Sequence, residues 1–426
     1  MKVLLISANT EKINMPTLPL GMASVAAATR GAGHEVAVLD LMFERDAQVV
    51  VRGTIEGFRP DAIGISVRNI DDQSRENPRF LLNPVRKIIT DCRNLSGAPI
   101  ILGGAGYSIF PESALSYLGA DMGIQGEGEV AFPLLLDRWK RQGELSGVPG
   151  LYLPGGISGG RRDFTKNLDS LAFPDNYLWS PSALDNQELW IPVQSRRGCP
   201  LNCSYCSTAI IEGRTTRRRS PELVVREVSR LADTGFDHFY FVDNTFNFPS
   251  SYAREICRLI LRGGLNITWR CITYPLNIDE ELVISMAKAG CREVSLGFES
   301  GSERILSLMN KRFKPADVRR ISMMLAEQGI RQMGFLLLGG PGETKETVEE
   351  SLNFADSLRL NALKITMGIR VYPHTSVAKI SMDEGLISFH DDLLLPRFYL
   401  ARGLEDWLSE TLKNWVAARP HWMFQV

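Results

Sequence analysis

The stretch that decides the fold runs from residue 191 to residue 206 and reads IPVQSRRGCPLNCSYC. It begins with a short apolar segment typical of a buried strand and ends in a loop that carries three of the chain's seven cysteines. The loop has the spacing C-x3-C-x2-C, with Tyr205 directly before the last cysteine. The other cysteines are scattered along the chain, and their spacing indicates no disulfide framework.

Three chemistries compete for this cysteine loop. Structural cysteines do not normally crowd into one loop, and zinc would need a fourth nitrogen or sulfur ligand, although no histidine lies nearby in the sequence. A 4Fe–4S cluster held by Cys199, Cys203 and Cys206 would instead leave one iron free for a substrate-like ligand. The pattern therefore favours the cluster.

From residue 191 onward, apolar strand-like segments alternate with helical ones. The strand-like segments lie at 191–198, 238–244, 267–275, 293–300, 332–340 and 362–373. This alternation predicts a partial parallel (β/α)6 barrel over residues 191–375, with its chemistry at the C-terminal ends of the strands. The aromatic-rich residues 376–426 are expected to form a helical C-terminal cap.

Another alternation of strands and helices precedes the barrel, so the whole chain is predicted to be α/β. Over residues 1–145 it predicts an open, parallel, Rossmann-like sheet of the flavodoxin type, with a ligand outside the carboxyl ends of the strands. Residues 146–190 are rich in Gly, Pro, Asn and Asp, which is typical of a linker. The first predicted strand is not followed by G-x-G-x-x-G, so a dinucleotide site is not indicated.

The cysteine loop resembles the signature of the radical S-adenosylmethionine (SAM) superfamily, C-x3-C-x-aromatic-C. The resemblance implies that the free iron chelates the amino and carboxylate groups of SAM, with Tyr205 near the adenine. It also implies an external one-electron donor of the flavodoxin or ferredoxin type, because reduction of SAM yields methionine and a 5′-deoxyadenosyl radical.

Later strand ends resemble the SAM contacts of the same superfamily, although each alone is equally typical of a turn. By this resemblance, the methionine amino group lies near the second strand, the ribose and carboxylate near the fourth, and the adenine near the fifth. In that order, the candidates are Asp243 and Asn244; Glu299 and Ser300; and Gly339 and Gly340. Arg270 on the third strand is a further candidate, and its alternative role is an ion pair with Glu299.

The N-terminal region is similar to the cobalamin-binding domain that precedes some radical SAM domains. The resemblance implies that loops at the ends of its strands surround the corrin. The candidate residues are Thr17, Leu18, Gly21, Ser66, Arg68, Asn69, Gly103, Gly104, Gly126 and Glu127.

One feature departs from cobalamin domains whose D-x-H-x-x-G motif supplies a histidine to cobalt. The corresponding loop here, NTEKINMPTLPLG, contains no histidine. We hypothesise that Arg68 lines the lower corrin face without binding cobalt, because a guanidinium stays protonated and offers no lone pair. The alternative is that Arg68 pairs with Asp71 or Asp72.

This domain order implies an enzyme that methylates an unactivated carbon, or a phosphorus, of a small molecule through a 5′-deoxyadenosyl radical and methylcobalamin. A non-methylating enzyme of the same architecture, catalysing ring formation, ring contraction or oxidation, stays an alternative, and a non-catalytic cobalamin or redox sensor is a third. The net charge of −1 indicates no nucleic-acid partner. No apolar run suggests a transmembrane segment, and the cytoplasm is the expected location.

Overall fold

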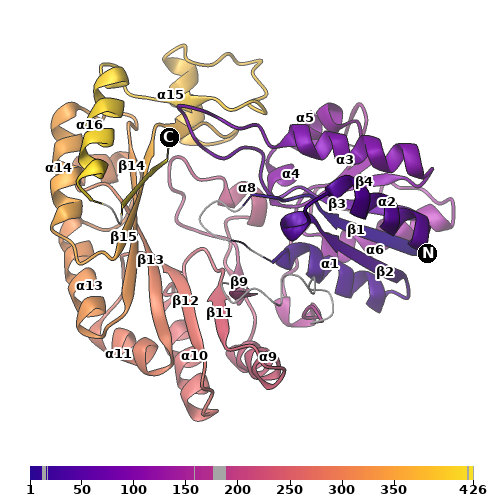
Figure 1. Ribbon diagram of the computed structural model, residues 1–426, viewed down its shortest axis with the longest axis horizontal. Coiled ribbons are helices and arrows are strands. Elements are labelled where there is room, and N and C mark those ends of the chain that lie inside the picture. Colours follow the sequence, from indigo (N-terminus) through magenta and orange to yellow (C-terminus); the bar gives the residue numbers. More distant parts are fainter. Residues whose placement is uncertain (12–15, 17, 158, 176–188, 420–421, 426) are drawn as a thin grey trace. The chain divides into compact units, whose positions relative to one another are not determined.

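The computed structural model describes residues 1–11, 16, 18–157, 159–175, 189–419 and 422–425. The chain divides into two compact units, each with its own sheet (Figure 1). One comprises Met1–Asp72, Arg79–Trp190 and Ile210–Gly213, and the other comprises Gln73–Pro78, Ile191–Ala209 and Arg214–Val426. A short excursion, Gln73–Pro78, thus leaves the N-terminal half of the sequence to join the second unit.

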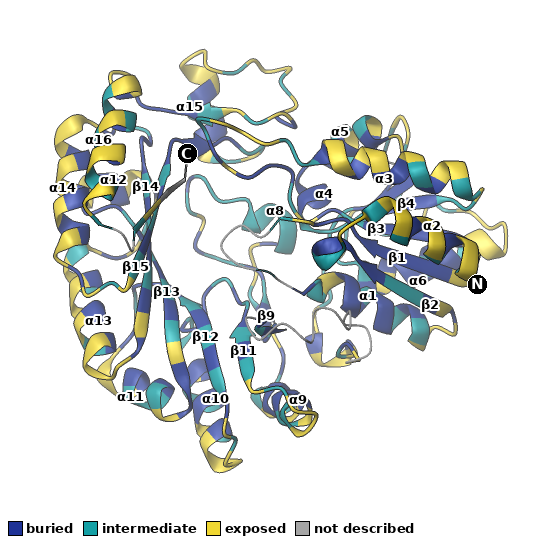
Figure 2. Ribbon diagram, in the orientation of Figure 1, coloured by how far each residue is buried: buried dark blue, intermediate teal, exposed yellow. Residues whose placement is uncertain are grey.

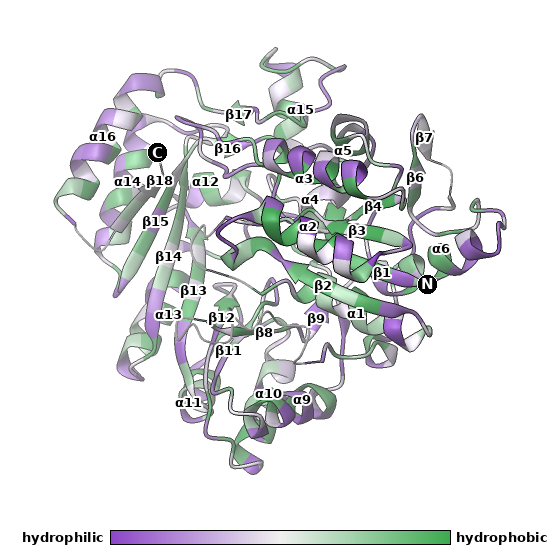
Figure 3. Cartoon of the chain, turned by 45° about the vertical axis from the view of Figure 1, so that its right-hand side comes forward, coloured by the Kyte–Doolittle hydropathy of each residue, from purple (hydrophilic) through white to green (hydrophobic). Residues whose placement is uncertain are grey.

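The sheet of the first unit has the strand order β2-β1-β3-β4-β5-β6-β7 within the described residues. Its parallel strands are β1 (Lys2–Ser7), β2 (Glu35–Asp40), β3 (Ala62–Ser66), β4 (Ile100–Gly103) and β5 (Met122–Ile124). They are mostly hydrophobic (Figure 3), and β1 is buried from its second residue to its last. A run buried on both faces of the sheet has no reason to alternate with polar residues.

Helices cover both faces of this first sheet (Figure 1). On one face α1 (Leu20–Gly31) packs against α6 (Gly128–Lys140), and on the other α2 (Ala47–Phe58) packs against α3 (Leu82–Leu95). The short helices α4 (Ala105–Ile109) and α5 (Pro111–Leu118) follow β4. The predicted doubly covered parallel sheet is confirmed.

Part of the predicted linker is also part of this sheet. Strands β6 (Leu151–Leu153) and β7 (Gly156–Ile157) pair antiparallel beside β5. Their turn contains Gly155 and Gly156, both with positive φ. The glycines that suggested a linker therefore form a tight hairpin, because only glycine adopts such angles freely.

The sheet of the second unit is parallel, with the order β18-β15-β14-β13-β12-β11-β8 within the described residues. Along the chain its strands are β8 (Ile191–Val193), β11 (His238–Phe241), β12 (Thr268–Thr273), β13 (Cys291–Glu299), β14 (Arg331–Leu338), β15 (Ala362–Met367) and β18 (Trp422–Gln425). The helices are α9 (Pro221–Asp233), α10 (Ser250–Arg262), α11 (Glu280–Lys288), α12 (Glu303–Leu308), α13 (Pro315–Glu327) and α14 (Lys345–Asp356).

The helices of the second unit cover one face of its sheet and expose their outer surfaces to solvent (Figure 2). Buried and half-buried residues alternate along β12, β13 and β14. The buried set faces the helices, since Phe298 of β13 contacts Phe354 of α14 with ring centroids 5.8 Å apart. The half-buried set, which includes Arg270 and Glu299, therefore faces the opposite, concave side.

The C-terminal residues form more than the expected helical cap. They contain α15 (Ser376–Asp383) and α16 (Glu405–Ala417), but β18 adds a further parallel strand beside β15. The backbone of β15 would otherwise present an unpaired edge. Packing of Trp415 against Trp422, with ring centroids 4.5 Å apart, joins α16 to this strand. Among the helices that the structure describes, none has the length and apolarity needed to cross a membrane.

Candidate functional site

The cysteine loop follows β8 and the two-residue strand β9 (Arg196–Arg197). All seven cysteines lie within the described residues and none of them forms a disulfide, and only Cys199, Cys203 and Cys206 are not buried. The Sγ atom of Cys206 accepts a hydrogen bond from the backbone N–H of Thr208, at 3.5 Å. Burial raises the pKa of the Cys203 thiol, and the charge of Lys311 opposes that rise. The cysteines that are half-buried rather than buried are therefore those of the motif.

Three thiols in one loop are the ligand type of an iron–sulfur cluster. Among the described residues, no three His, Cys, Asp or Glu side chains converge on a point where one metal ion could bind. Zinc requires such convergence, whereas a 4Fe–4S cluster binds each thiolate through a different iron. Cys199, Cys203 and Cys206 are the residues that would hold it.

Lys311 is a site residue that sequence reasoning missed. It lies between α12 and α13, and its Nζ is 3.2 Å from Oε1 of Glu299 and 5.2 Å from the ring centroid of Tyr205. Burial would lower the pKa of this amine, but the charges of Glu299, Tyr205 and Cys203 together raise it well above its usual value. Nothing in the local pattern LMNKRFKP identifies this lysine, because its neighbours are distant in sequence.

The two predicted charged candidates on the concave side have different partners. Glu299 has a φ of 61° and lies where the register between β13 and β14 shifts. Its carboxylate pairs with Lys311. Arg270 pairs with Glu293, at 3.7 Å, and lies over the ring of Tyr240. The alternative that Arg270 pairs with Glu299 is therefore wrong, and Lys311 occupies that role.

The side chain of Asp243 is closed to ligands and instead holds the backbone ahead of the cysteine loop. Its side chain is fully buried, and its carboxylate accepts hydrogen bonds from the backbone N–H groups of Ser195 and Arg196, at 2.8 and 3.1 Å. Ser300 is also buried, 2.9 Å from the hydroxyl of Ser351. Asn244, half-buried beside Asp243, stays the polar candidate at the end of β11. A sequence pattern cannot distinguish inward from outward side chains in a loop.

The turn after β14 is held by a residue that was not predicted. Oε2 of Glu343 accepts hydrogen bonds from the backbone N–H groups of Gly339 and Gly340, at 2.5 and 2.9 Å. Gly339 has a φ of 92°, and a Cβ there would meet the side chain of Leu400 at 2.4 Å. Burial raises the pKa of Glu343 to about 7, and the two backbone donors oppose that rise. The turn thus requires glycine for its conformation.

In the first unit, the glycine turn after β4 lies against the loop after β3. A Cβ on Gly104, whose φ is 101°, would meet the carbonyl oxygen of Val67 at 2.6 Å. A Cβ on Gly106 would meet that of Arg68 at 2.9 Å. Gly103 has open space around it, with nothing within 4 Å of a Cβ. Gly104 is therefore needed for contact between backbones, and Gly103 is the glycine free to face a ligand.

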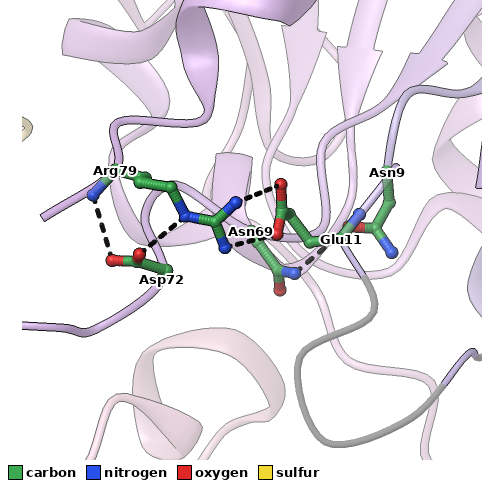
Figure 4. Close-up of polar contacts among 5 residues, drawn as sticks. All are labelled: Asn9, Glu11, Asn69, Asp72 and Arg79. Atoms are coloured by element: carbon green, nitrogen blue, oxygen red, sulfur yellow. Dashed lines mark hydrogen bonds and ion pairs between the residues drawn. The ribbon is translucent and has the colours of Figure 1, made fainter. Parts of the chain in front are cut away.

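Polar contacts also join the loops after β1 and β3 (Figure 4). Asn69 donates to Asn9, at 3.1 Å, and Arg79 pairs with both Glu11 and Asp72, at 2.7 and 3.0 Å. Asp72, one of two carboxylates predicted as alternative partners of Arg68, is thus engaged by Arg79. Arg68 itself is exposed. Burial raises the pKa of the nearby Asp40 carboxyl, and the positive charge of Arg68 opposes that rise.

The remaining predicted cobalamin contacts are placed as follows. Leu18 is buried, Gly21 is exposed and Ser66 is half-buried at the end of β3. The N–H of Gly126 donates to the hydroxyl of Ser108, at 2.9 Å, and the carboxylate of Glu127 accepts from the N–H of Thr165, at 2.8 Å. Thr17 and linker residues 176–188 lie outside the described residues.

Two family models match separate parts of the chain. The model of the B12 binding domain matches residues 6–136, and that of the radical SAM superfamily matches residues 193–355. The chain therefore joins a B12 binding domain to a radical SAM domain. Its cofactors are accordingly a 4Fe–4S cluster, SAM and cobalamin, and this prediction is confirmed.

Relatives of this radical SAM protein include methyltransferases. An uncharacterized methyltransferase of Pyrococcus horikoshii is 28% identical over 91% of this chain and 84% of its own length. A tryptophan 2-C-methyltransferase of Streptomyces laurentii is 24% identical over 87% of this chain and 73% of its own. A further match is the structure of the methyltransferase TsrM from Kitasatospora setae with cobalamin and a 4Fe–4S cluster bound. The match covers 99% of this chain and 90% of the TsrM chain, with a TM-score of 0.85. At 22% identity, that last likeness shows the fold.

Proposed function

We propose that this radical SAM protein is a methyltransferase for a small-molecule substrate with an unactivated carbon or a phosphorus as the acceptor. The observation that carries the proposal is the presence of a B12 binding domain ahead of a radical SAM domain in one chain. Relatives that span both domains carry methyltransferase names. When bound, the cluster and SAM supply a radical source, and cobalamin supplies a transferable methyl group.

On the second unit, the residues at the strand ends bind and orient SAM. We propose that the three thiolates of the loop hold the cluster, and that Tyr205, Asn244, Glu299, Gly339 and Gly340 line the SAM site beside it. Asp243, Ser300 and Glu343 would support the backbone around this site and would not contact SAM themselves, because their polar atoms already bind protein groups. Arg270 faces the same concave side, where its cation favours an anionic ligand.

On the first unit, the strand-end loops would surround the corrin. We propose that Ser66, Asn69, Gly103, Gly126 and Glu127 form its rim, together with Leu18, Gly21 and Thr17. Arg68 would lie at the lower face as a protonated, non-coordinating group. In the electron paramagnetic resonance (EPR) spectrum of the Co(II) form, we expect no splitting from an axial nitrogen. A histidine-type splitting would contradict this assignment of the lower face.

An external one-electron donor of the flavodoxin or ferredoxin type and a cytoplasmic location are parts of the same proposal. Free thiols that hold an oxygen-sensitive cluster need a reducing compartment. The predicted boundaries at residues 145, 190 and 375 also remain proposals.

The test is anaerobic reconstitution with iron, sulfide and hydroxocobalamin, followed by mass spectrometry of products formed from methyl-labelled SAM and candidate substrates. A methyltransferase produces S-adenosylhomocysteine and 5′-deoxyadenosine in step, with label in the product. A non-methylating enzyme of the same family produces 5′-deoxyadenosine without stoichiometric S-adenosylhomocysteine. The Cys203→Ala variant is the control for products that do not depend on the cluster. No SAM cleavage by the reduced, loaded protein would favour a sensor and contradict the proposal.

A further inference from the structure

Four consecutive residues between α12 and α13, Met309 to Arg312, lie along the cysteine loop. The carbonyl of Met309 accepts from the N–H of Ser204, at 3.1 Å. The Asn310 amide donates to the carbonyl of Asn202, at 2.7 Å, and the Arg312 guanidinium donates to that of Pro200, at 3.3 Å. The Nζ of Lys311 lies 5.2 Å from the ring centroid of Tyr205. Each of residues 309–312 thus contacts the cysteine loop.

The other three residues bind uncharged backbone groups of the cysteine loop. Lys311 instead brings a positive charge into the interior. Its side chain is 5% exposed, and that of its partner Glu299 is 14% exposed. Its immediate neighbours Asn310 and Arg312 are exposed, so the lysine turns inward between two exposed residues. An ammonium is costly to bury without compensation. In the protein without a cluster, the carboxylate of Glu299 compensates the Lys311 ammonium. A thiolate at Cys203 would also be attracted by this ammonium.

The cluster that the loop would hold brings more negative charge than Glu299 does. Three thiolates around a 4Fe–4S core leave a net negative assembly in its oxidised form, and one-electron reduction adds another negative charge. A fixed cation close to such a cluster stabilises the reduced form more than the oxidised one. Net charge and hydrogen bonding near a cluster are the factors by which proteins set its reduction potential.

We propose that Lys311 is a positioning residue whose buried ammonium raises the reduction potential of the cluster. The inference rests on the proposed cluster site. The step concerned is the transfer of one electron from an external donor to the oxidised cluster. No bond forms or breaks, and Lys311 keeps its proton throughout.

The experiment measures the midpoint potential of the reconstituted cluster by EPR-monitored titration with dithionite, without SAM. Lys311→Met should shift the midpoint to a more negative value, and Lys311→Arg should stay near the wild type. Glu299→Gln should shift it the opposite way, because it removes the anion that offsets the lysine. A loss of structure alone does not produce shifts of opposite sign at two partners.

The chain offers a matched control pair in the same segment. Lys314 pairs with Glu303 at 2.6 Å, but these side chains are 67% and 62% exposed. Solvent screens their charges, so Lys314→Met and Glu303→Gln should leave the midpoint unchanged. Equal shifts from the buried and exposed pairs would overturn the proposal.

An unchanged midpoint in Lys311→Met, or a shift to a less negative value, would also overturn it. If Lys311→Met binds no cluster, Glu299→Gln decides, because a midpoint that does not become less negative contradicts the charge effect. These outcomes are separable from the proposed function. The midpoint can be read whether or not any substrate is methylated, and methyl transfer can occur whichever residue sets the potential.

Discussion

The carboxylate of Asp243 and the guanidinium of Arg196 form an ion pair that is closed to solvent. Nε of Arg196 lies 3.5 Å from Oδ2 of Asp243, and the two side chains are 2% and 0% exposed. The same carboxylate binds two backbone N–H groups just ahead of the cysteine loop. One charged pair thus connects the end of β11 to the segment that leads into the proposed cluster site.

We therefore expect Asp243→Asn to be strongly destabilising. Removing one partner of a buried pair leaves an uncompensated charge and costs about 3–5 kcal/mol. The free energy of unfolding from urea denaturation measures the loss. Asp237→Asn is the control, since Asp237 is 74% exposed and pairs with His238 at the surface. Similar stability losses in both variants would show that burial of the pair is not the cause.

Glu343 should make stability depend on pH. Its folded-state pKa of about 7 lies above the ordinary value of 4.5, so the folded protein binds more protons between these values. Stability must then fall as pH rises through this window, by roughly 3 kcal/mol in total. Glu343→Gln keeps an acceptor for the turn but cannot ionise. Urea denaturation from about pH 5 to about pH 8 should show the variant gaining on the wild type, and parallel curves would contradict the pKa assignment.

The two glycines at the end of β4, Gly103 and Gly104, should respond differently to alanine. Gly104→Ala places a Cβ 2.6 Å from a backbone oxygen at a φ of 101°, so a stability loss of about 2 kcal/mol or more is expected. Gly103→Ala has open space and should fold normally. If Gly103 faces the corrin, its added methyl group should still weaken hydroxocobalamin binding by about tenfold. Normal affinity in a stable Gly103→Ala protein would remove this residue from the proposed rim.

Cysteine variants test the cluster site directly. After reconstitution with iron and sulfide, Cys203→Ala should lack the visible absorption of the cluster and its iron, because two thiolates cannot retain the cluster. Cys257→Ala is the control, since Cys257 is buried in α10 and does not belong to the motif. Iron bound equally by both variants would show that the loop does not hold the cluster.

Much of this protein could be predicted from local patterns. Apolar strand-like segments that alternate with glycine-ended helices identify the two α/β units, and the spacing of Cys199, Cys203 and Cys206 identifies the cluster chemistry. These features depend on residues close in sequence, where periodicity and spacing carry the information. The hairpin β6–β7 lies inside the predicted linker, and the pattern does not reveal it because a tight turn and a linker share Gly and Pro.

Sequence alone established a three-thiolate loop after a strand and the order of the two domains. Only the tertiary structure decided which side chains support that loop. Lys311 lies beside Tyr205, Asp243 turns into the interior, and Glu343 holds the glycine turn. Such partners are brought together by packing of strands and helices, and the direction of a loop side chain has no periodicity that a sequence could reveal.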